Sequence, residues 1–215
     1  MASTSYRSIY RKRKPPPDPV NLRREIVSRE ETKLKRRFVC VVGDEGTGRH
    51  TLVHRFLTMS SDASQEPENR RGRTSYILTN LSERPHIRRP RAVHLHVFIF
   101  NFQELDLETI HHIVGQVNSC IVIFDVGRSI TFHTAIHCMI KITELLRSKA
   151  PRFILVGNKI DLHQREISAD SGRRVARICS AQRYYDCSAQ MNVNMDAVFD
   201  ALLIMSVYPH SPLPR

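Results

Sequence analysis

The chain has 215 residues, 41% of them hydrophobic and 25% charged, and its 33 Lys and Arg against 21 Asp and Glu give a formal charge of +12. This length and composition predict one soluble domain with a single core and exclude the fibrous and wholly disordered classes. No apolar run approaches the roughly 18 residues of a membrane-spanning helix, so we expect no such helix.

The positive charge lies in two segments. Residues 1–37 hold 12 basic and 4 acidic side chains, and residues 70–91 hold seven arginines and one glutamate, which leaves the rest close to neutral. Residues 1–37 lack apolar periodicity and include three consecutive prolines, so we predict a disordered basic tail. Such a tail either contacts an anionic membrane or an acidic partner, or only aids solubility. Nucleic-acid binding is not expected, because no recognised module or interleaved aromatic residues accompany the charge.

The five cysteines, Cys40, Cys120, Cys138, Cys179 and Cys187, are an odd number without C-x-x-C spacing. This usage indicates a reducing compartment. We therefore expect a cytoplasmic protein that is peripheral at the inner face of the plasma membrane if the basic tail binds lipid. Four of the five lie in or beside apolar runs, where buried structural thiols are expected.

Apolar runs and helical spacing alternate along the rest of the chain. Strands are predicted at 38–42, 93–100, 120–124, 153–156 and around 184–185, and helices at 49–59, 130–146, 169–179 and 195–207. This alternation favours a mostly parallel sheet with right-handed crossovers. Because ligands bind at the carboxyl ends of the strands in such folds, the candidate site lies in the loops that follow the strands.

The loop after the first predicted strand resembles a phosphate-binding loop. It reads G-D-E-G-T-G-R-H-T over 43–51, against the pattern G-x-x-x-x-G-K-[ST]. Glycines let the backbone curl so that successive N–H groups and a helix N-terminus surround a phosphate. The candidate phosphate-binding residues are Gly43, Glu45, Gly46, Thr47, Gly48, Arg49, His50 and Thr51.

Two side chains of this loop depart from the pattern. Arg49 stands where a lysine would reach the β- and γ-phosphates, and it keeps the charge on a larger, planar group. His50 stands where a hydroxyl would ligate Mg²⁺, and a neutral imidazole is a poor ligand for that ion. Thr51 supplies the nearest hydroxyl and is a candidate for the α-phosphate or the metal.

The loop after the predicted strand at 153–156 fits N-K-x-D, a guanine-reading motif, with Asn158, Lys159 and Asp161. The Asp161 carboxylate can accept from both donors on the Watson–Crick edge of guanine, where adenine offers the wrong pattern. We expect the Lys159 stem to lie across the ring and Asn158 to tie this loop to the phosphate loop.

A third motif follows the last predicted strand. Ser188, Ala189 and Gln190 come after Cys187 and match [C/T]-S-A-[K/Q], in which the Ala189 N–H meets the guanine carbonyl oxygen. With three motifs in this order and spacing, the chain over roughly 37–207 resembles the Ras superfamily of small GTPases. Within that range, residues 154–162, 165–168 and 192–199 look most like Ras and the Rad/Gem/Kir (RGK) group.

The resemblance implies an α/β fold of the P-loop NTPase class, a small-GTPase-like, mostly parallel six-stranded sheet with helices on both faces. The G domain would span 38–207, between the basic tail at 1–37 and a short C-terminal tail at 208–215. It further implies a monomer that binds GTP or GDP and signals through effector proteins that the sequence does not identify.

The loop after the strand at 93–100 departs from the D-x-x-G motif of this superfamily. Asn101 and Glu104 occupy the positions whose aspartate holds Mg²⁺ and whose glycine senses the γ-phosphate, and Leu105 replaces the water-positioning glutamine. Gln103 is the weak candidate for that catalytic role. Hydrolysis depends on positioning and charge stabilisation, so we expect it to be weak or absent and Mg²⁺ binding to be doubtful. The RGK group has D-x-W-E here, which places a glutamate where Glu104 stands, whereas the aromatic residue of this chain, Phe102, comes one place earlier than in that group.

The switch I segment should lie within the basic residues of about 60–91. It should contain a threonine that reaches Mg²⁺ in the triphosphate state, and Thr74 and Thr79 are both candidates. Its length and charge are consistent with an ordered insertion, a mobile loop, or a contact for an acidic partner.

Three functional hypotheses remain open from the sequence. The first is a guanine-nucleotide-binding, small-GTPase-like signalling protein with weak or absent hydrolysis. The second is a slow GTPase switch of the RGK type, for which the resemblance implies regulation of voltage-gated calcium channels through the channel β subunit, with calmodulin as a partner. The third is a pseudo-GTPase scaffold that binds no nucleotide.

Overall fold

The computed structural model describes residues 35–59, 75–78 and 93–207, and the structural account is confined to these residues. The basic tail up to residue 34, most of the predicted switch I segment and residues 208–215 lie outside them. The two threonines predicted as switch I candidates, Thr74 and Thr79, are therefore also outside the described residues.

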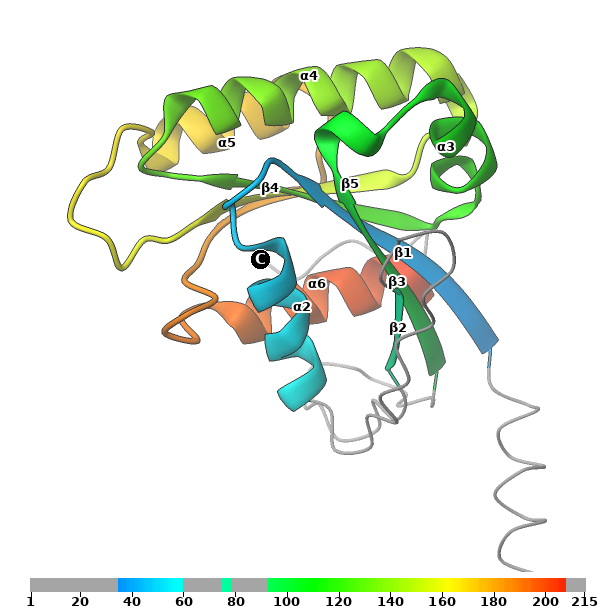
Figure 1. The fold of residues 1–215 in the computed structure, drawn as a ribbon, viewed down its shortest axis with the longest axis horizontal. Coiled ribbons are helices and arrows are strands. Elements are labelled where there is room, and N and C mark those ends of the chain that lie inside the picture. Colours follow the sequence, from blue (N-terminus) through cyan, green and yellow to red (C-terminus); the bar gives the residue numbers. More distant parts are fainter. Residues whose placement is uncertain (1–34, 60–74, 79–92, 208–215) are drawn as a thin grey trace, which may run out of the picture. The chain divides into compact units, whose positions relative to one another are not determined.

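Within the described residues, six strands form one sheet in the order β2-β3-β1-β4-β5-β6 (Figure 1). They are β1 (Lys35–Gly43), β2 (Ser75–Leu78), β3 (Val93–Asn101), β4 (Ser119–Asp125), β5 (Arg152–Asn158) and β6 (Arg183–Asp186). All neighbours pair in parallel except β2, which pairs antiparallel with β3. The predicted mostly parallel six-stranded sheet is confirmed.

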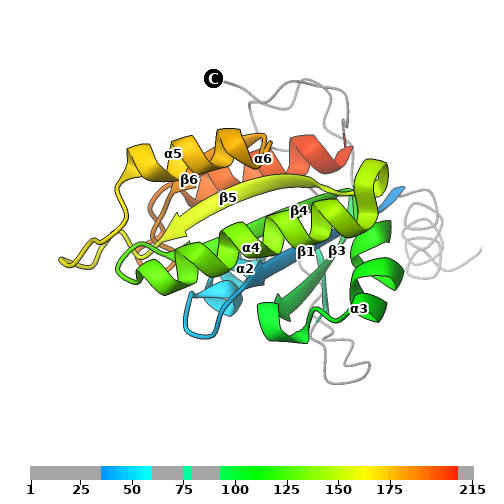
Figure 2. The ribbon, with the colours of Figure 1, turned by 90° about the horizontal axis from the view of Figure 1, so that it is seen from above.

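Helices cover both faces of this sheet, as predicted (Figures 1 and 2). They are α2 (Arg49–Thr58), α3 (Leu107–His112), α4 (Ser129–Leu146), α5 (Ala169–Ile178) and α6 (Met195–Val207), with short 3₁₀ turns η1 (Phe102–Glu104), η2 (Val114–Gln116) and η3 (Arg147–Lys149). Helices α2 and α6 pack on one face, and α3, α4 and α5 pack on the other. None of the described helices is long and apolar enough to cross a membrane.

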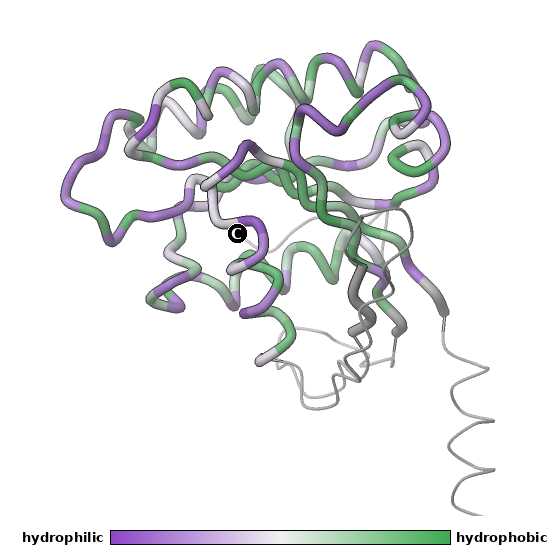
Figure 3. The backbone as a smooth tube through the Cα atoms, viewed as in Figure 1, coloured by the Kyte–Doolittle hydropathy of each residue, from purple (hydrophilic) through white to green (hydrophobic). Residues whose placement is uncertain are grey.

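The apolar runs form the central strands because both faces of the sheet are covered. Along β1, Val39 and Val41 face α2 and α6, whereas Cys40 and Val42 face α3 and α4. Every residue of β4 is buried. Figure 3 shows the same pattern, with hydrophobic colour concentrated along the central strands and polar residues interspersed along α4.

The cysteines are all free thiols. Cys40, Cys120, Cys138 and Cys187 are buried and Cys179 is half-buried, which confirms the prediction of four buried structural thiols. Burial raises the pKa of the Cys187 thiol to about 12, so this group stays protonated and unreactive at neutral pH.

The structure differs from the sequence prediction at three elements. Strand β1 begins at Lys35, inside the segment assigned to the tail, because it pairs in unbroken register with β3 from Lys35 beside Val93 to Gly43 beside Asn101. Strand β2 and helix α3 were not predicted. The remaining predicted elements agree with the structure to within about two residues at most boundaries.

Candidate nucleotide-binding site

The loop between β1 and α2 has the backbone geometry that a phosphate loop requires. Gly46 and Gly48 adopt φ values of 72° and 92°, in the left-handed region that favours glycine. A Cβ atom on Gly48 would collide with the side-chain amide of Asn158. Thr47 is buried, and its hydroxyl donates to the Asp44 carbonyl at 2.8 Å, which closes the turn before the helix.

Helix α2 presents basic side chains at its N-terminus and no acidic residue in its first turn. Arg49 and His50 are its first two residues, and Thr51 follows within the same turn. Burial lowers the pKa of Arg49, against the raising effect of Glu104, Asp44 and Glu45. These basic groups reinforce the positive end of the helix dipole, so the position favours an anion.

The surroundings of His50 favour its neutral form. Burial and the neighbouring charge of Arg49 lower its pKa, and Glu104 opposes them. A neutral imidazole at this position offers neither the hydroxyl nor the carboxylate oxygen that Mg²⁺ prefers.

The turn after β3 lies beside the phosphate loop, because Asn101 pairs with Gly43 in the β1–β3 register. The Asn101 N–H donates to Glu104 Oε2 at 2.8 Å, and the Asn101 side chain accepts from the Gln103 N–H, which forms a capping box around η1. Glu104 acts electrostatically on both Arg49 and His50, so its carboxylate lies near the N-terminus of α2. Leu105 is buried in the core, whereas Gln103 is exposed.

The donor set at this position does not fit Mg²⁺. Asn101 and Glu104 are engaged with each other in the capping box, and the neighbouring side chains are the basic Arg49 and His50. Among the described residues, no group of three or more His, Cys, Asp or Glu side chains is arranged to hold a metal ion.

The three predicted loops meet at the side chain of Asn158. Its Nδ2 donates to the Thr47 carbonyl at 2.8 Å, so the predicted link to the phosphate loop is present. Its Oδ1 accepts from the Ala189 N–H at 3.0 Å and from the Cys187 thiol at 3.6 Å. The Ala189 N–H, which the motif assigns to the guanine carbonyl oxygen, therefore has a protein partner in this structure.

Lys159 and Asp161 follow at the end of β5. Asp161 is exposed, whereas the Lys159 ammonium lies 2.7 Å from Asp125 Oδ2. Asp125 ends β4, and its side chain is only 4% exposed. Burial alone would raise the pKa of this carboxyl, but bonds from Lys159, the Gly127 N–H and Arg128 lower it overall. Sequence reasoning missed Asp125, although an acidic residue at the end of a wholly apolar strand was a usable signal.

Helix α2 also holds the third loop. Arg55 Nε donates to the Ala189 carbonyl at 2.8 Å, and its Nη2 donates to the Gln190 carbonyl at 2.6 Å. Ser188 is buried, and its Oγ accepts from the Met191 N–H at 3.0 Å. The Arg55 contacts have no local sequence signal, because they join residues more than 130 positions apart.

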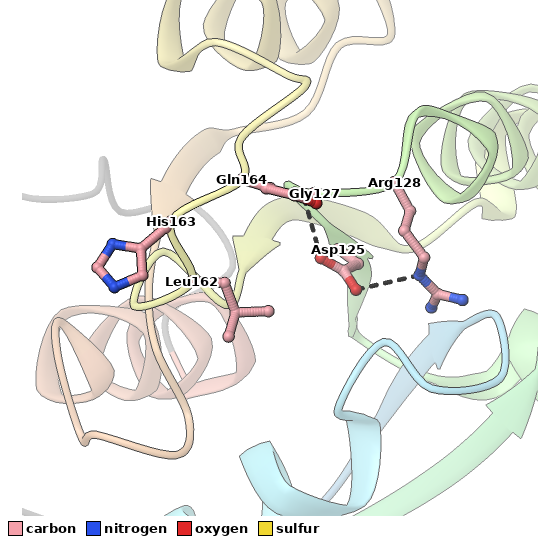
Figure 4. A pocket seen from close by; sticks show the side chains of 6 residues that line it. All are labelled: Asp125, Gly127, Arg128, Leu162, His163 and Gln164. Atoms are coloured by element: carbon pink, nitrogen blue, oxygen red, sulfur yellow. Dashed lines mark hydrogen bonds and ion pairs between the residues drawn. The ribbon is translucent and has the colours of Figure 1, made fainter.

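A cavity of about 370 Å³ opens at this edge of the sheet. It is lined by Asp125, Gly127, Arg128, Leu162, His163 and Gln164 (Figure 4). Figure 4 shows Asp125 between Leu162 and Arg128, with the phosphate loop nearby. The cavity thus lies between the loop that follows β4 and residues 162–164, and none of the predicted phosphate-binding or base-binding residues lines it.

Comparison with known proteins decides the family. The family model described as "Ras family" matches residues 38–207. The chain belongs to the Ras family. This Ras-family chain is 23% identical over 190 residues to the Ras-related protein Rab-12 of mouse and of human, an alignment that covers 88% of this chain and 69% of Rab-12. It is also 36% identical over 66 residues to the GTP-binding protein Rheb homolog of Drosophila melanogaster, covering 30% of this chain and 36% of that protein. Membership of the Ras family implies guanine-nucleotide binding.

The site of this Ras-family domain fits a guanine nucleotide better than it fits the metal. The glycine turn and the α2 N-terminus suit phosphates, and the exposed Asp161 carboxylate is open to a base. The two halves are held together by Asn158, so one ligand can contact both.

Proposed function

We propose that this Ras-family domain binds guanine nucleotide with little dependence on Mg²⁺, hydrolyses GTP weakly or not at all, and acts through contacts with effector proteins. The observation that carries the proposal is the contrast between the two halves of the site. The base-reading loop is held by Asn158 and Lys159, whereas Glu104 and His50 replace the groups that would serve Mg²⁺ and the γ-phosphate.

The residues that bind the phosphates in this proposal belong to the first loop and the start of α2. They are Gly43, Glu45, Gly46, Thr47, Gly48, Arg49, His50 and Thr51. Successive N–H groups and the helix N-terminus supply the donors, and Arg49 supplies a fixed positive charge. In place of a metal, this cation offsets the phosphate charge.

The residues that read the base belong to the loops after β5 and β6. Asp161 accepts from the guanine edge, Lys159 covers the ring, and Ser188, Ala189 and Gln190 line the opposite side. Asn158 holds this half against the phosphate loop through the Thr47 carbonyl. Selectivity for guanine over adenine follows from Asp161, because a carboxylate offers acceptors only.

Weak hydrolysis follows from the turn after β3. Leu105 is buried and offers no polar atom to a water molecule, and the Glu104 carboxylate adds negative charge where a γ-phosphate would lie. Gln103 is the remaining candidate for positioning water, because its side chain is exposed at the same turn.

We also propose a monomeric, cytoplasmic protein whose basic tail contacts anionic membrane or an acidic partner.

Nucleotide titration of the purified full chain tests the proposal. Fluorescent GDP should bind with similar affinity in Mg²⁺ and in EDTA, and ADP should compete at least tenfold more weakly. Asp161→Asn should abolish that preference, while Asp170→Asn on the exposed start of α5 should leave it unchanged. Equal competition by ADP and GDP, or strong Mg²⁺ dependence, would contradict the proposal.

A second candidate is a slow GTPase of the RGK type that regulates voltage-gated calcium channels. Glu104 and the neighbouring aromatic Phe102 in η1 favour it, because that group carries a glutamate and an aromatic residue in the same loop. Its partners would be the channel β subunit and calmodulin. Single-turnover hydrolysis that Gln103→Ala removes, together with specific binding to the β subunit, would support this candidate over the first.

A third candidate is a scaffold without nucleotide. Contacts within the protein hold the base loop, because the Ala189 N–H donates to Asn158 and the Asn158 amide donates to the Thr47 carbonyl. An empty site after purification, with no thermal shift on adding GDP or GTP, would favour the scaffold.

A further inference from the structure

Arg128 connects two loops that the sequence motifs treat separately. It lies between β4 and α4 and immediately precedes α4. Its Nε donates to Asp125 Oδ2 at 3.1 Å, and its Nη2 donates to the Glu45 carbonyl on the phosphate loop at 3.0 Å. Figure 4 shows the side chain extending from the α4 end of the loop, bonded to Asp125.

Asp125 fixes the position of the Arg128 guanidinium. Its Oδ1 accepts from the Gly127 N–H at 3.0 Å, and its Oδ2 accepts from both Arg128 and Lys159. The carboxylate is buried, so removing a partner from it is costly. The Arg128 side chain therefore stays in place, although it is itself 44% exposed.

The bond to Glu45 controls the orientation of one peptide group. In a trans peptide the C=O of one residue and the N–H of the next point in opposite directions. The described residues contain no cis peptide bond, so the Gly46 N–H points away from the Arg128 guanidinium. Gly46 itself lies against Arg128, since a Cβ on it would approach Nη2 to 3.2 Å. The loop is thus held at Glu45 by Arg128 and at Thr47 by Asn158.

We propose that Arg128 is a positioning residue for the phosphate loop, which it holds in its ligand-binding shape without a metal ion. The proposal rests on the function proposed above. A loop that is already ordered loses less conformational entropy when it binds an anion, so affinity increases. Asp125 and the Glu45 carbonyl are bonded by two different nitrogens of the planar guanidinium, Nε and Nη2, whereas a lysine offers all its donors from one nitrogen.

The test compares a ligand that has phosphates with one that has none. GDP and guanosine are titrated against the full-length chain and against Arg128→Ala, Arg128→Lys and Arg173→Ala. Arg173 is the matched control, because it also pairs with an aspartate three residues away, Asp170, but on exposed α5. Both Arg128 variants should bind GDP about tenfold more weakly and guanosine as the wild type does. Arg173→Ala should bind both ligands normally.

Each other outcome has a distinct meaning. Unchanged GDP affinity in Arg128→Ala, or full affinity in Arg128→Lys, would overturn the positioning role and leave nucleotide binding intact. An equal loss for GDP and guanosine, accompanied by a lower Tm, would show a general loss of structure and also overturn it. A wild-type chain that binds neither ligand would refute the proposed function itself.

Discussion

The side-chain amide of Asn158 bonds the Thr47 carbonyl at 2.8 Å and the Ala189 N–H at 3.0 Å, so one buried residue links the phosphate loop to the last loop of the site. These segments are separated by more than 100 residues in the sequence. Asn158 therefore holds the two halves of the predicted nucleotide site against each other. Its removal should affect both stability and binding.

Asn158→Ala should lower the free energy of unfolding by about 2–4 kcal/mol, because it leaves a buried carbonyl and a buried N–H without partners. Urea denaturation at neutral pH measures this. Gln182→Ala is the control, since that exposed amide accepts one long bond from Arg152 at 3.3 Å, and it should cost less than about 1 kcal/mol. If Asn158→Ala lowers the free energy of unfolding no more than Gln182→Ala does, the linking role of Asn158 is contradicted.

Gly172→Ala should destabilise the domain although alanine is the better helix former. Gly172 lies within α5 against the ring of Tyr184, which β6 holds in place and whose hydroxyl bonds Asp186. The added methyl should cost about 1–3 kcal/mol, which exceeds the gain of about 1 kcal/mol in helix propensity. Gly115→Ala is the matched control, because its Cβ would meet the flexible end of Leu146 at 3.3 Å and the Ile110 carbonyl oxygen at 3.5 Å, an ordinary van der Waals distance. Thermal unfolding should show a lower Tm for the first variant and little change for the second.

GDP affinity should rise as the pH falls from about 8 to about 6. The pKa of His50 is lowered by burial and by Arg49, against the opposing effect of Glu104. An adjacent phosphate would raise this pKa, so binding takes up a proton and is favoured at lower pH. His50→Gln should flatten the profile, while the exposed His133→Gln should not. Calorimetry in buffers of different ionisation enthalpy measures the proton uptake directly.

The stability of the protein without ligand should depend on pH in the opposite direction to the GDP affinity. A histidine with a lowered folded-state pKa binds more protons when unfolded, so it contributes full stability above the unfolded pKa near 6.5 and less as the pH falls below it. Wild-type stability should therefore fall between about pH 7 and 5 more steeply than that of His50→Gln. If the free energy of unfolding, measured in urea, falls equally with pH for the two proteins, the effect is ruled out.

Glu104→Gln should raise the affinity for GTP relative to GDP several-fold. The change removes a negative charge that faces Arg49 and His50 but keeps an oxygen for the Asn101 N–H. A non-hydrolysable GTP analogue and GDP are compared by fluorescence competition. Glu108→Gln, in the exposed first turn of α3, is the control. An unchanged ratio would mean that Glu104 does not face the third phosphate.

The strands and helices that carry the site follow from the sequence because their signals are local. Apolar runs at 38–42, 120–124 and 153–156 became buried strands, and the glycine turn fixed where the phosphate loop begins. Helix α3 was missed because its six residues, L-E-T-I-H-H, are too short for periodicity. Its one signal was the Asp106 cap, which accepts from the Thr109 N–H at 2.7 Å.

The residues that hold the site together were not predicted, for a physical reason. Arg55 and Arg128 act through carbonyl oxygens of distant backbone, and any residue type supplies such an acceptor. No motif spacing records these contacts, since they depend on the three-dimensional approach of loops. The motifs identified which residues should touch a ligand, whereas the structure was needed to find the residues that position them.

Helix α2 begins at the phosphate loop and, less than two turns later, bonds the Ala189 and Gln190 carbonyls through Arg55. Helix α2 thus sets the distance between the loop proposed to bind the phosphates and the loop proposed to bind the base. This distance is the same for ligands with one phosphate more or fewer. The length of the phosphate chain is therefore not read by α2, and the Glu104→Gln variant tests the turn after β3 for that role.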